Sequence, residues 1–217
     1  MGEDVQQDDG EQARGGVPGA PTPDLSPAQA RIAEAAIRVI AEQGFDVVSV
    51  RTVAAEAGLS AGTVQYHYPR RRDLLLAALG WSVQRQVNRI EAAVGDTAGG
   101  SARQRMGAAL RELLPLEGQR SEDAAVWVSF GAAASTRDWL REVYWAEVQR
   151  FRQGLLAALE AAQAAGRLRE GLTPQTAAPL VTALVNGLTL DVLNAPAAEQ
   201  ALAEEALDRG LALIVMD

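Results

Sequence analysis

The feature that most constrains this chain is a pair of very short helical patterns, at residues 50–57 and 61–67, separated only by a turn. Ser49 and Ser60 stand before the two patterns as N-cap residues, and Gly58 can take the left-handed conformation that ends a helix in a sharp turn. Helices this short are not stable alone in water, so both must pack against another helix. The segment therefore predicts a helix-turn-helix unit.

The supporting helix is predicted directly upstream. Ser26 is a good N-cap residue, Pro27 suits the first helical position, and Gln29 completes a capping box. Apolar residues then recur on one helical face, and the pattern stops at Gly44, a type of residue that commonly follows a helix end. These signals complete a unit of three helices.

Almost all of the remaining chain follows the helical period. The only β-like run, Val47–Val50, is too short to predict a strand, and it contains the N-cap residue Ser49. We therefore expect an all-α protein of about nine helices. Its expected parts are a disordered tail (1–24), a helix-turn-helix domain (25–80) and a larger helical domain (81–217). The later helices are expected near residues 71–94, 102–115, 122–135, 137–165, 174–193 and 196–215.

The residue composition excludes several kinds of site. The chain has no cysteine and a single histidine, His67, so disulfides, thiolate metal sites and thiol nucleophiles are excluded. No cofactor or metal is expected, and a Gly-rich phosphate loop and a Gly-x-Ser-x-Gly elbow are both missing. No Ser or Asp motif supports His67 as a catalytic base. An enzyme based on carboxylates alone is the most distant alternative.

Charge is distributed unevenly along the sequence. The net charge is −8, yet residues 31–90 carry eight arginines against five acidic residues. Arg70, Arg71 and Arg72 open the next helix, where each cation opposes the helix dipole by about 0.3–1 kcal/mol unless an external phosphate faces it. We therefore expect this part of the chain to face DNA, with the helix at 61–67 in the major groove.

Residues 31–80 resemble the DNA-binding domain of the TetR family of one-component transcriptional regulators. The resemblance lies in the order of motifs: a helix that ends in Gly44-Phe45, the run Ser-Val-Arg-Thr-Val-Ala-x-x-Ala-Gly-Leu-Ser-x-Gly-Thr-Val from Ser49, then Tyr-His-Tyr-Pro and a basic helix start. The rest of the chain matches only in length and helical pattern. The resemblance implies a homodimer that binds a double-stranded DNA operator and a small-molecule effector.

The resemblance also implies which residues face DNA. Many family members carry Tyr where this chain has Gln65, whose amide can pair with adenine, so we expect Gln65 to read a base. Positions that face bases are Arg51, Ala61, Gly62 and Gln65, positions that face phosphates are Thr63, Tyr66, His67 and Arg71, and Thr52 is placed in the same set.

The larger domain is expected to hold an effector pocket and a dimer interface. Four tryptophans in an aromatic-poor chain suggest an aromatic-lined pocket for a mainly apolar or aromatic molecule, although each could equally fill the core. The stripe of Thr182, Asn186 and Thr189 could face a ligand, a partner helix or water. The expected ligand-binding residues are Trp81, Gln84, Asn88, Trp127, Phe130, Tyr144, Trp145 and Asn186. The expected dimer interface, in the last two helices, is Leu184, Leu188, Leu207, Gly210, Leu211 and Ile214.

We therefore expect a cytoplasmic, ligand-responsive repressor that binds a palindromic operator as a dimer and is released by a small molecule. A transcriptional activator, or a regulator without an effector, is the alternative that the sequence leaves open. No apolar run reaches the roughly 18 residues of a transmembrane helix, so no membrane contact is expected. Gly80, inside the helix at 71–94, marks either a close contact or a bend.

Overall fold

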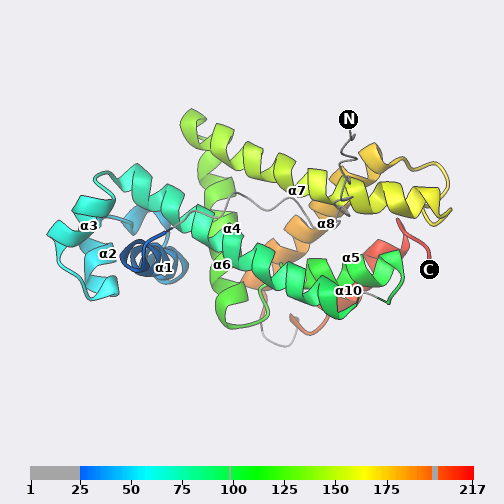
Figure 1. Ribbon diagram of the computed structural model, residues 1–217, viewed down its shortest axis with the longest axis horizontal. Coiled ribbons are helices and arrows are strands. Elements are labelled where there is room, and N and C mark those ends of the chain that lie inside the picture. Colours follow the sequence, from blue (N-terminus) through cyan, green and yellow to red (C-terminus); the bar gives the residue numbers. More distant parts are fainter. Residues whose placement is uncertain (1–24, 98, 197–199) are drawn as a thin grey trace, which may run out of the picture.

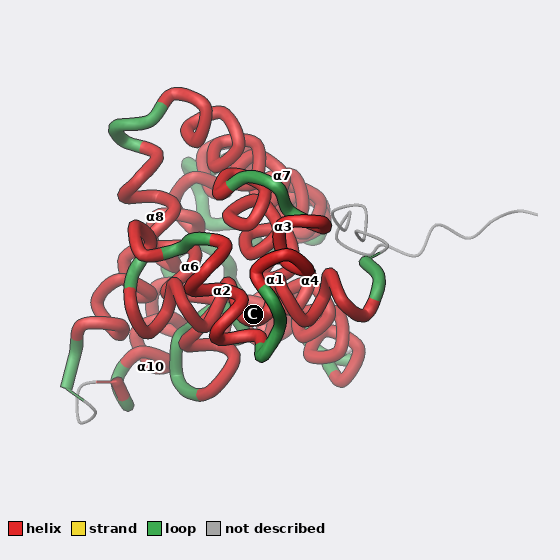
Figure 2. The backbone as a smooth tube through the Cα atoms, turned by 90° about the vertical axis from the view of Figure 1, so that its left-hand side faces the viewer, coloured by secondary structure: helices red, strands yellow, loops and turns green. Residues whose placement is uncertain are grey.

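The computed structural model describes residues 25–97, 99–196 and 200–217, and the predicted tail over residues 1–24 lies outside them. Figure 2 shows this part of the chain as helices joined by short loops, which confirms the all-α prediction. The elements are α1 (Pro27–Gln43), the 3-10 helix η1 (Phe45–Val47), α2 (Val50–Ala57), α3 (Ala61–His67), α4 (Arg71–Asp96), α5 (Ala102–Arg111), α6 (Gly118–Ala134), α7 (Asp138–Ala164), α8 (Pro174–Asn194) and α10 (Ala203–Ala212).

The first three α-helices have the predicted boundaries because local groups satisfy their ends. The Ser26 hydroxyl accepts a hydrogen bond from the Gln29 backbone N–H at 3.3 Å, and the Gln29 side chain accepts one from the Ser26 N–H at 2.9 Å. Ser49 and Thr52 form the same reciprocal capping box at α2. Gly58 follows α2 with a φ of 62°, in the left-handed region that glycine adopts without strain. The turn between α2 and α3 is thus encoded locally.

One buried cluster holds α1, α2 and α3 together and continues into the larger domain. It contains Ile32 and Ile40 of α1, Val53 of α2 and Val64 of α3, all nearly or fully buried. The same cluster includes Phe130 of α6, and α1 packs against α4 and α6 as well as α2. The hydrophobic core therefore crosses the domain boundary predicted near residue 80.

Helix α4 joins the two parts of the molecule. Figure 1 shows it starting beside α1–α3 at one end and running through the centre of the protein to α5. A Cβ atom built on Gly80 would meet no atom within 4 Å, so Gly80 does not mark a close contact between α4 and a neighbouring helix. A second buried cluster, formed by residues of α5, α7, α8 and α10, makes the core of the larger domain.

The predicted end of α5 and the predicted start of α6 are wrong. Helix α5 ends at Arg111 rather than near residue 115, because the chain tightens there: Leu113 and Leu114 each donate to the carbonyl oxygen three residues earlier, just before Pro115. Helix α6 consequently has room to begin at Gly118, four residues before its predicted start.

The last helix is shorter than the predicted 196–215, of which residues 197–199 lie outside the described part of the chain. Beyond α10 the backbone pairs with the segment that follows α7. Arg169 N–H donates to the Ile214 carbonyl at 2.9 Å, and Met216 N–H donates to the Arg167 carbonyl at 2.7 Å. These bonds replace continued helix at the end of the described chain.

Helix α8 is long and apolar enough, by length and composition alone, to cross a membrane. No uninterrupted apolar run of that length is present, because polar residues interrupt α8; the helix passes on its mean hydropathy. A single helix of this kind is weak evidence, since core helices of other proteins pass the same test. In this structure α8 packs against α6, α7 and α10.

Candidate functional site

Helix α3 buries one face and presents the other to solvent. Val64 is fully buried, and Tyr68, directly after the helix, is only 8% exposed. Gln65 is exposed, and the Tyr66 side chain is 83% exposed although it is large and aromatic. The small residues Ala61 and Gly62 at the start of α3 are exposed as well, which would let another surface approach the helix closely. The arrangement suits a helix that enters a DNA groove.

The other residues expected to contact DNA differ in exposure and in the partners that their side chains have within the protein. Arg51 of α2 is exposed, whereas Thr63 and His67 are half-buried. The His67 ring lies edge-on to Tyr66 with ring centroids 5.1 Å apart. The Thr52 hydroxyl donates to the Val47 carbonyl at 2.9 Å, so Thr52 serves the start of α2.

Arg71 is held by the protein itself. Its Nε donates to the Val48 carbonyl at 2.8 Å, and a terminal nitrogen donates to the Phe45 carbonyl at 2.7 Å. The guanidinium also stacks over the Phe45 ring, 5.3 Å from its centroid. Arg71 therefore fixes the turn that precedes α2. Its side chain is still 40% exposed, and its contact with a DNA phosphate stays a prediction. Arg70 was not among the residues predicted to contact DNA, but it is exposed at the N-cap of α4. Its position in the run Arg70–Arg72 is the sequence signal for such a contact.

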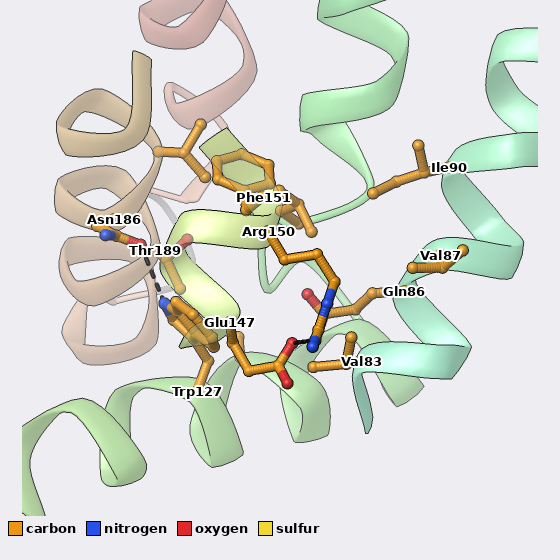
Figure 3. A pocket seen from close by; sticks show the side chains of 13 residues that line it. Val83, Gln86, Val87, Ile90, Trp127, Glu147, Arg150, Phe151, Asn186 and Thr189 are labelled. Carbon is orange, nitrogen blue, oxygen red and sulfur yellow. Dashed lines mark hydrogen bonds and ion pairs between the residues drawn. The ribbon is translucent and has the colours of Figure 1, made fainter. Parts of the chain in front are cut away.

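A cavity of about 100 Å³ lies between α4, α6, α7 and α8. Figure 3 shows side chains from these four helices converging on it. Most of the lining is apolar, and neutral polar and charged groups are few. The lining residues are Val83, Gln86, Val87, Ile90, Leu113, Ala124, Trp127, Glu147, Arg150, Phe151, Val185, Asn186 and Thr189. The lining, mainly apolar with a few polar groups, is of the kind found in small-molecule sites, and the volume restricts the cavity to a compact molecule.

The Trp127 ring is fixed from two sides. Its indole N–H donates to Asn186 Oδ1 at 3.0 Å, which joins α6 to α8 (Figure 3). The Tyr144 ring packs behind it with centroids 4.6 Å apart. Burial raises the pKa of Tyr144 above its ordinary value. The orientation of this cavity wall is therefore preset by the protein.

Only part of the expected ligand-binding set lines the cavity. Trp127 and Asn186 do, and Tyr144 supports Trp127 from behind. Phe130 is fully buried in the core, where its ring packs edge-on against Phe45 at 5.1 Å. The Trp145 side chain is 50% exposed, outside the lining.

The ligand-binding face predicted for α4 differs from the face that lines this cavity. Trp81, Gln84 and Asn88 lie outside the lining, and the Gln84 amide donates to Asn88 Oδ1 at 2.8 Å instead. The cavity face begins with Val83, which is rotated by about 200° from Trp81 around a helix of 3.6 residues per turn. The aromatic residue marked a different side, because helical period alone does not tell which face meets α6, α7 and α8.

A buried ion cluster ties α4 to its neighbours next to this cavity. Arg85 of α4 and Asp123 of α6 are 8% and 1% exposed, and their closest nitrogen and oxygen lie 2.6 Å apart. The Arg85 guanidinium also pairs with Glu122 at 3.0 Å and with Glu34 of α1 at 3.4 Å. Desolvation lowers the pKa of Arg85, but the hydrogen bonds and charges of Asp123 and Glu122 outweigh it and raise the pKa. Displacement of α4 would disturb contacts with both α6 and α1.

The expected dimer residues mostly face their own subunit. Leu207, Leu211 and Ile214 are buried in the core of the larger domain. A Cβ on Gly210 would lie 2.6 Å from Leu184 Cδ2, so this glycine allows close packing of α10 on α8 within one chain. That arrangement corrects the predicted interface: these residues pack the two helices together. Leu188 is partly buried against the same core.

An exposed recognition helix on a three-helix unit, joined by one long helix to a bundle with an internal cavity, defines a helix-turn-helix transcriptional regulator. Two family descriptions match the chain: "Bacterial regulatory proteins, tetR family" over residues 32–78 and "BetI-type transcriptional repressor, C-terminal" over residues 102–215. The chain belongs to the TetR family. These families consist of regulators, which confirms that the protein is not an enzyme.

Relatives cover most of the chain. The regulator PksA of Bacillus subtilis is 28% identical over 167 residues, which cover 76% of this chain and 78% of PksA. A transcriptional regulator from Rhodococcus sp. Rha1 has a crystal structure with 33% identity and a TM-score of 0.70, and the match covers 86% of this chain and 95% of that one. A regulator from Saccharomonospora viridis, solved in complex with choline, has 27% identity and a TM-score of 0.78, with 89% and 100% covered.

Proposed function

We propose that this DNA-binding regulator is a dimeric repressor that leaves its operator when a compact small molecule fills the cavity. The match of its larger domain to BetI-type repressors supports repression. The choline complex of the Saccharomonospora viridis regulator supports a small-molecule site in the same fold. The alternative, activation of transcription, has no comparable support. The protein would act on DNA in the cytoplasm.

The observation that carries this proposal is the double contact made by α4. One end of the helix holds the turn before α2 through Arg71, and its middle lines the cavity through Val83 and Val87. A ligand that fits one position of α4 better than another would shift the population of conformations toward that position. The recognition helices of a dimer would then lose the spacing of about 34–36 Å that successive major grooves require.

An exposed apolar surface supports the dimer. Leu180 and Leu190 of α8 are each 48% exposed, Leu213 after α10 is 72% exposed, and Leu202 before α10 is 57% exposed. Two of these leucines lie on α8 and two flank α10, which packs against α8, so we place the contact with the partner there. Two copies of α8 and α10 would form a four-helix bundle around a two-fold axis. We propose these exposed leucines in place of Leu207, Leu211 and Ile214, which are buried within one chain.

The test uses the purified full chain and labelled DNA from upstream of its own gene. We expect a dimer in light scattering, and fluorescence anisotropy that reports tighter binding to one palindromic segment than to random DNA of equal length. Equal affinity for both DNAs would contradict operator recognition. A monomer that still binds the palindrome tightly would contradict the dimer.

A further inference from the structure

Of the described residues that line the cavity, two are charged, Glu147 and Arg150. They lie one helical turn apart on α7 and form an ion pair. Figure 3 shows the Arg150 side chain reaching to the Glu147 carboxylate in the cavity wall. The side chains are 19% exposed for Glu147 and 34% for Arg150, so water screens the pair only in part. The wall thus carries opposite charges that neutralise each other.

The aromatic residues of the wall would by themselves suit a cation. Trp127 and Phe151 both line the cavity, and aromatic faces attract ammonium groups. A cation in a partly desolvated site also needs an anion to balance it. Glu147 supplies the carboxylate of this lining, and that carboxylate is already paired with the Arg150 guanidinium. A cationic ligand beside Glu147 would therefore either meet the guanidinium or have to displace it.

An anionic ligand meets the reverse difficulty, because Arg150 is already paired and Glu147 would repel the newcomer. An uncharged ligand leaves the ion pair closed. It needs only the apolar walls and hydrogen bonds to neutral groups, which Gln86, Asn186 and Thr189 provide in the lining. The charge pattern therefore favours a molecule with no net charge.

We infer that Arg150 sets the charge selectivity of the cavity, which takes a compact uncharged molecule and rejects a cation of the same shape. This inference rests on the proposed effector role of the cavity and adds the chemical class of the effector. It separates this chain from the Saccharomonospora viridis regulator, which was solved with a cation, choline.

Three compounds of closely similar shape test the inference, since they differ in the charge that they carry: choline (cation), 3,3-dimethyl-1-butanol (uncharged) and 3,3-dimethylbutanoate (anion). Calorimetric titration of the full chain without DNA gives a Kd for each. The wild-type protein should bind the alcohol about tenfold or more tightly than choline, the ratio expected when a charged group loses or lacks its partner. Arg150→Gln should shift the ratio of alcohol to choline affinity toward choline by a similar factor. Glu147→Gln should shift the ratio of alcohol to 3,3-dimethylbutanoate affinity toward the anion.

The double variant Glu147→Gln/Arg150→Gln is the matched control, because it keeps the cavity and removes both charges. It should prefer the alcohol, as the wild type does. Arg150→Met, which keeps the aliphatic stem, replaces Arg150→Gln if the latter does not fold by circular dichroism. Wild-type protein that binds choline as well as the alcohol, or an Arg150 variant with an unchanged ratio, would overturn the inference.

Failure of this inference is distinguishable from failure of the proposed function. The ligand titrations need no DNA, and operator binding is measured separately by anisotropy without any ligand. A protein that binds its operator but prefers choline keeps the proposed function and loses the charge selectivity. A protein that shows the expected ligand ratios but does not distinguish operator from random DNA keeps the charge selectivity and loses the proposed function.

Discussion

At the scale of single residues, the surface of α3 separates two kinds of side chain. Val64 and Tyr68 anchor the helix in the core, and Gln65 and Tyr66 project into solvent. The sequence predicts the inward position of Val64 and the outward positions of Gln65 and Tyr66, because both follow from the helical period. The sequence does not predict which polar side chains form hydrogen bonds within the protein. Arg71 is an example, because its guanidinium donates to the Val48 and Phe45 carbonyls.

Gln65→Ala should lower affinity for the operator and leave affinity for random DNA unchanged. A bidentate amide contact to adenine is worth about 1–3 kcal/mol of discrimination. Anisotropy titrations on both DNAs measure the difference, and Gln153→Ala, at an exposed position on α7, is the control. Equal losses on both DNAs would remove Gln65 from the base-reading set.

Arg71→Ala and Arg70→Ala form a second matched pair. Arg71→Ala should cost up to about 3 kcal/mol of stability, since hydrogen bonds from a charged group to two carbonyls are lost, and a flatter salt dependence of DNA binding would show the predicted phosphate contact as well. Arg70→Ala should leave the melting temperature unchanged and reduce the slope of log K against log salt by about two, since the proposed dimer loses one phosphate contact in each subunit. Melting curves and salt titrations check both, and an unchanged melting temperature in Arg71→Ala contradicts the structural role.

Two tyrosines give the protein an alkaline limit. Burial raises the pKa of Tyr68 and of Tyr144 above the ordinary value of 10.0, because the phenolate is poorly solvated in the folded protein. The stability contributed by the neutral phenols is complete below the unfolded pKa and is lost as the pH rises through the folded pKa. Denaturation curves above about pH 10 should show this loss, and Tyr144→Phe should reduce it. A wild-type-like alkaline loss in that variant would point to other groups.

At the scale of elements, sequence signals work where they are local. The caps at Ser26, Ser49 and Ser60 place the first three α-helices correctly. Faces that depend on tertiary packing are predicted poorly. Trp81 and Leu207 are apolar residues at helical positions that suit a pocket wall and a dimer interface. The way α4 crosses its neighbours and α10 crosses α8 decides which residues each of them contacts. Helical period offers two or more candidate faces and no means to choose between them.

Leu190→Glu should separate the proposed dimer into folded monomers. The side chain is 48% exposed within one chain, so the charge is tolerated there and becomes costly only when a partner covers it. Light scattering should report half the mass with unchanged circular dichroism, and Ala161→Glu at an exposed position of α7 is the control. Leu207→Glu should instead unfold the protein, because Leu207 is fully buried. A stable Leu190→Glu dimer would place the interface elsewhere.

At the scale of the whole molecule, the DNA-binding unit and the larger domain share one buried cluster. Phe45, in the turn before α2, packs on Phe130 of α6, and Arg71 and Arg137 both stack on Phe45. Arg137 lies immediately before α7, so both helices of the α6–α7 corner reach this turn. The sequence predicts two separate domains because the linking contacts are far apart in the chain. Long α4 is therefore not the sole connection between the cavity and α2 in the described chain, since the α6–α7 corner and α1 also link the two parts.

Phe130→Ala should cost about 3–5 kcal/mol of stability, as large aromatic truncations in cores do. It should also weaken operator binding, although Phe130 lies in the core, because Phe45 loses its support. Chemical denaturation followed by circular dichroism and by tryptophan emission should give coincident transitions, the sign of one cooperative unit. Separate transitions, with the α1–α3 unit melting independently, would contradict the shared core.

The position of Trp127 has a practical consequence for spectroscopy. Of the four tryptophans in the chain, Trp127 is the one that lies in the described lining of the cavity, with its ring clamped between Asn186 and Tyr144. A molecule entering the cavity changes the polarity and the collisional environment of that indole directly, and changes those of Trp81, Trp139 and Trp145 much less. The protein therefore carries a built-in optical reporter of occupancy, and a library of unlabelled compounds can be screened by emission alone. A Trp127→Phe protein, which keeps the emission of Trp81, Trp139 and Trp145, is the reference that lacks the reporting indole.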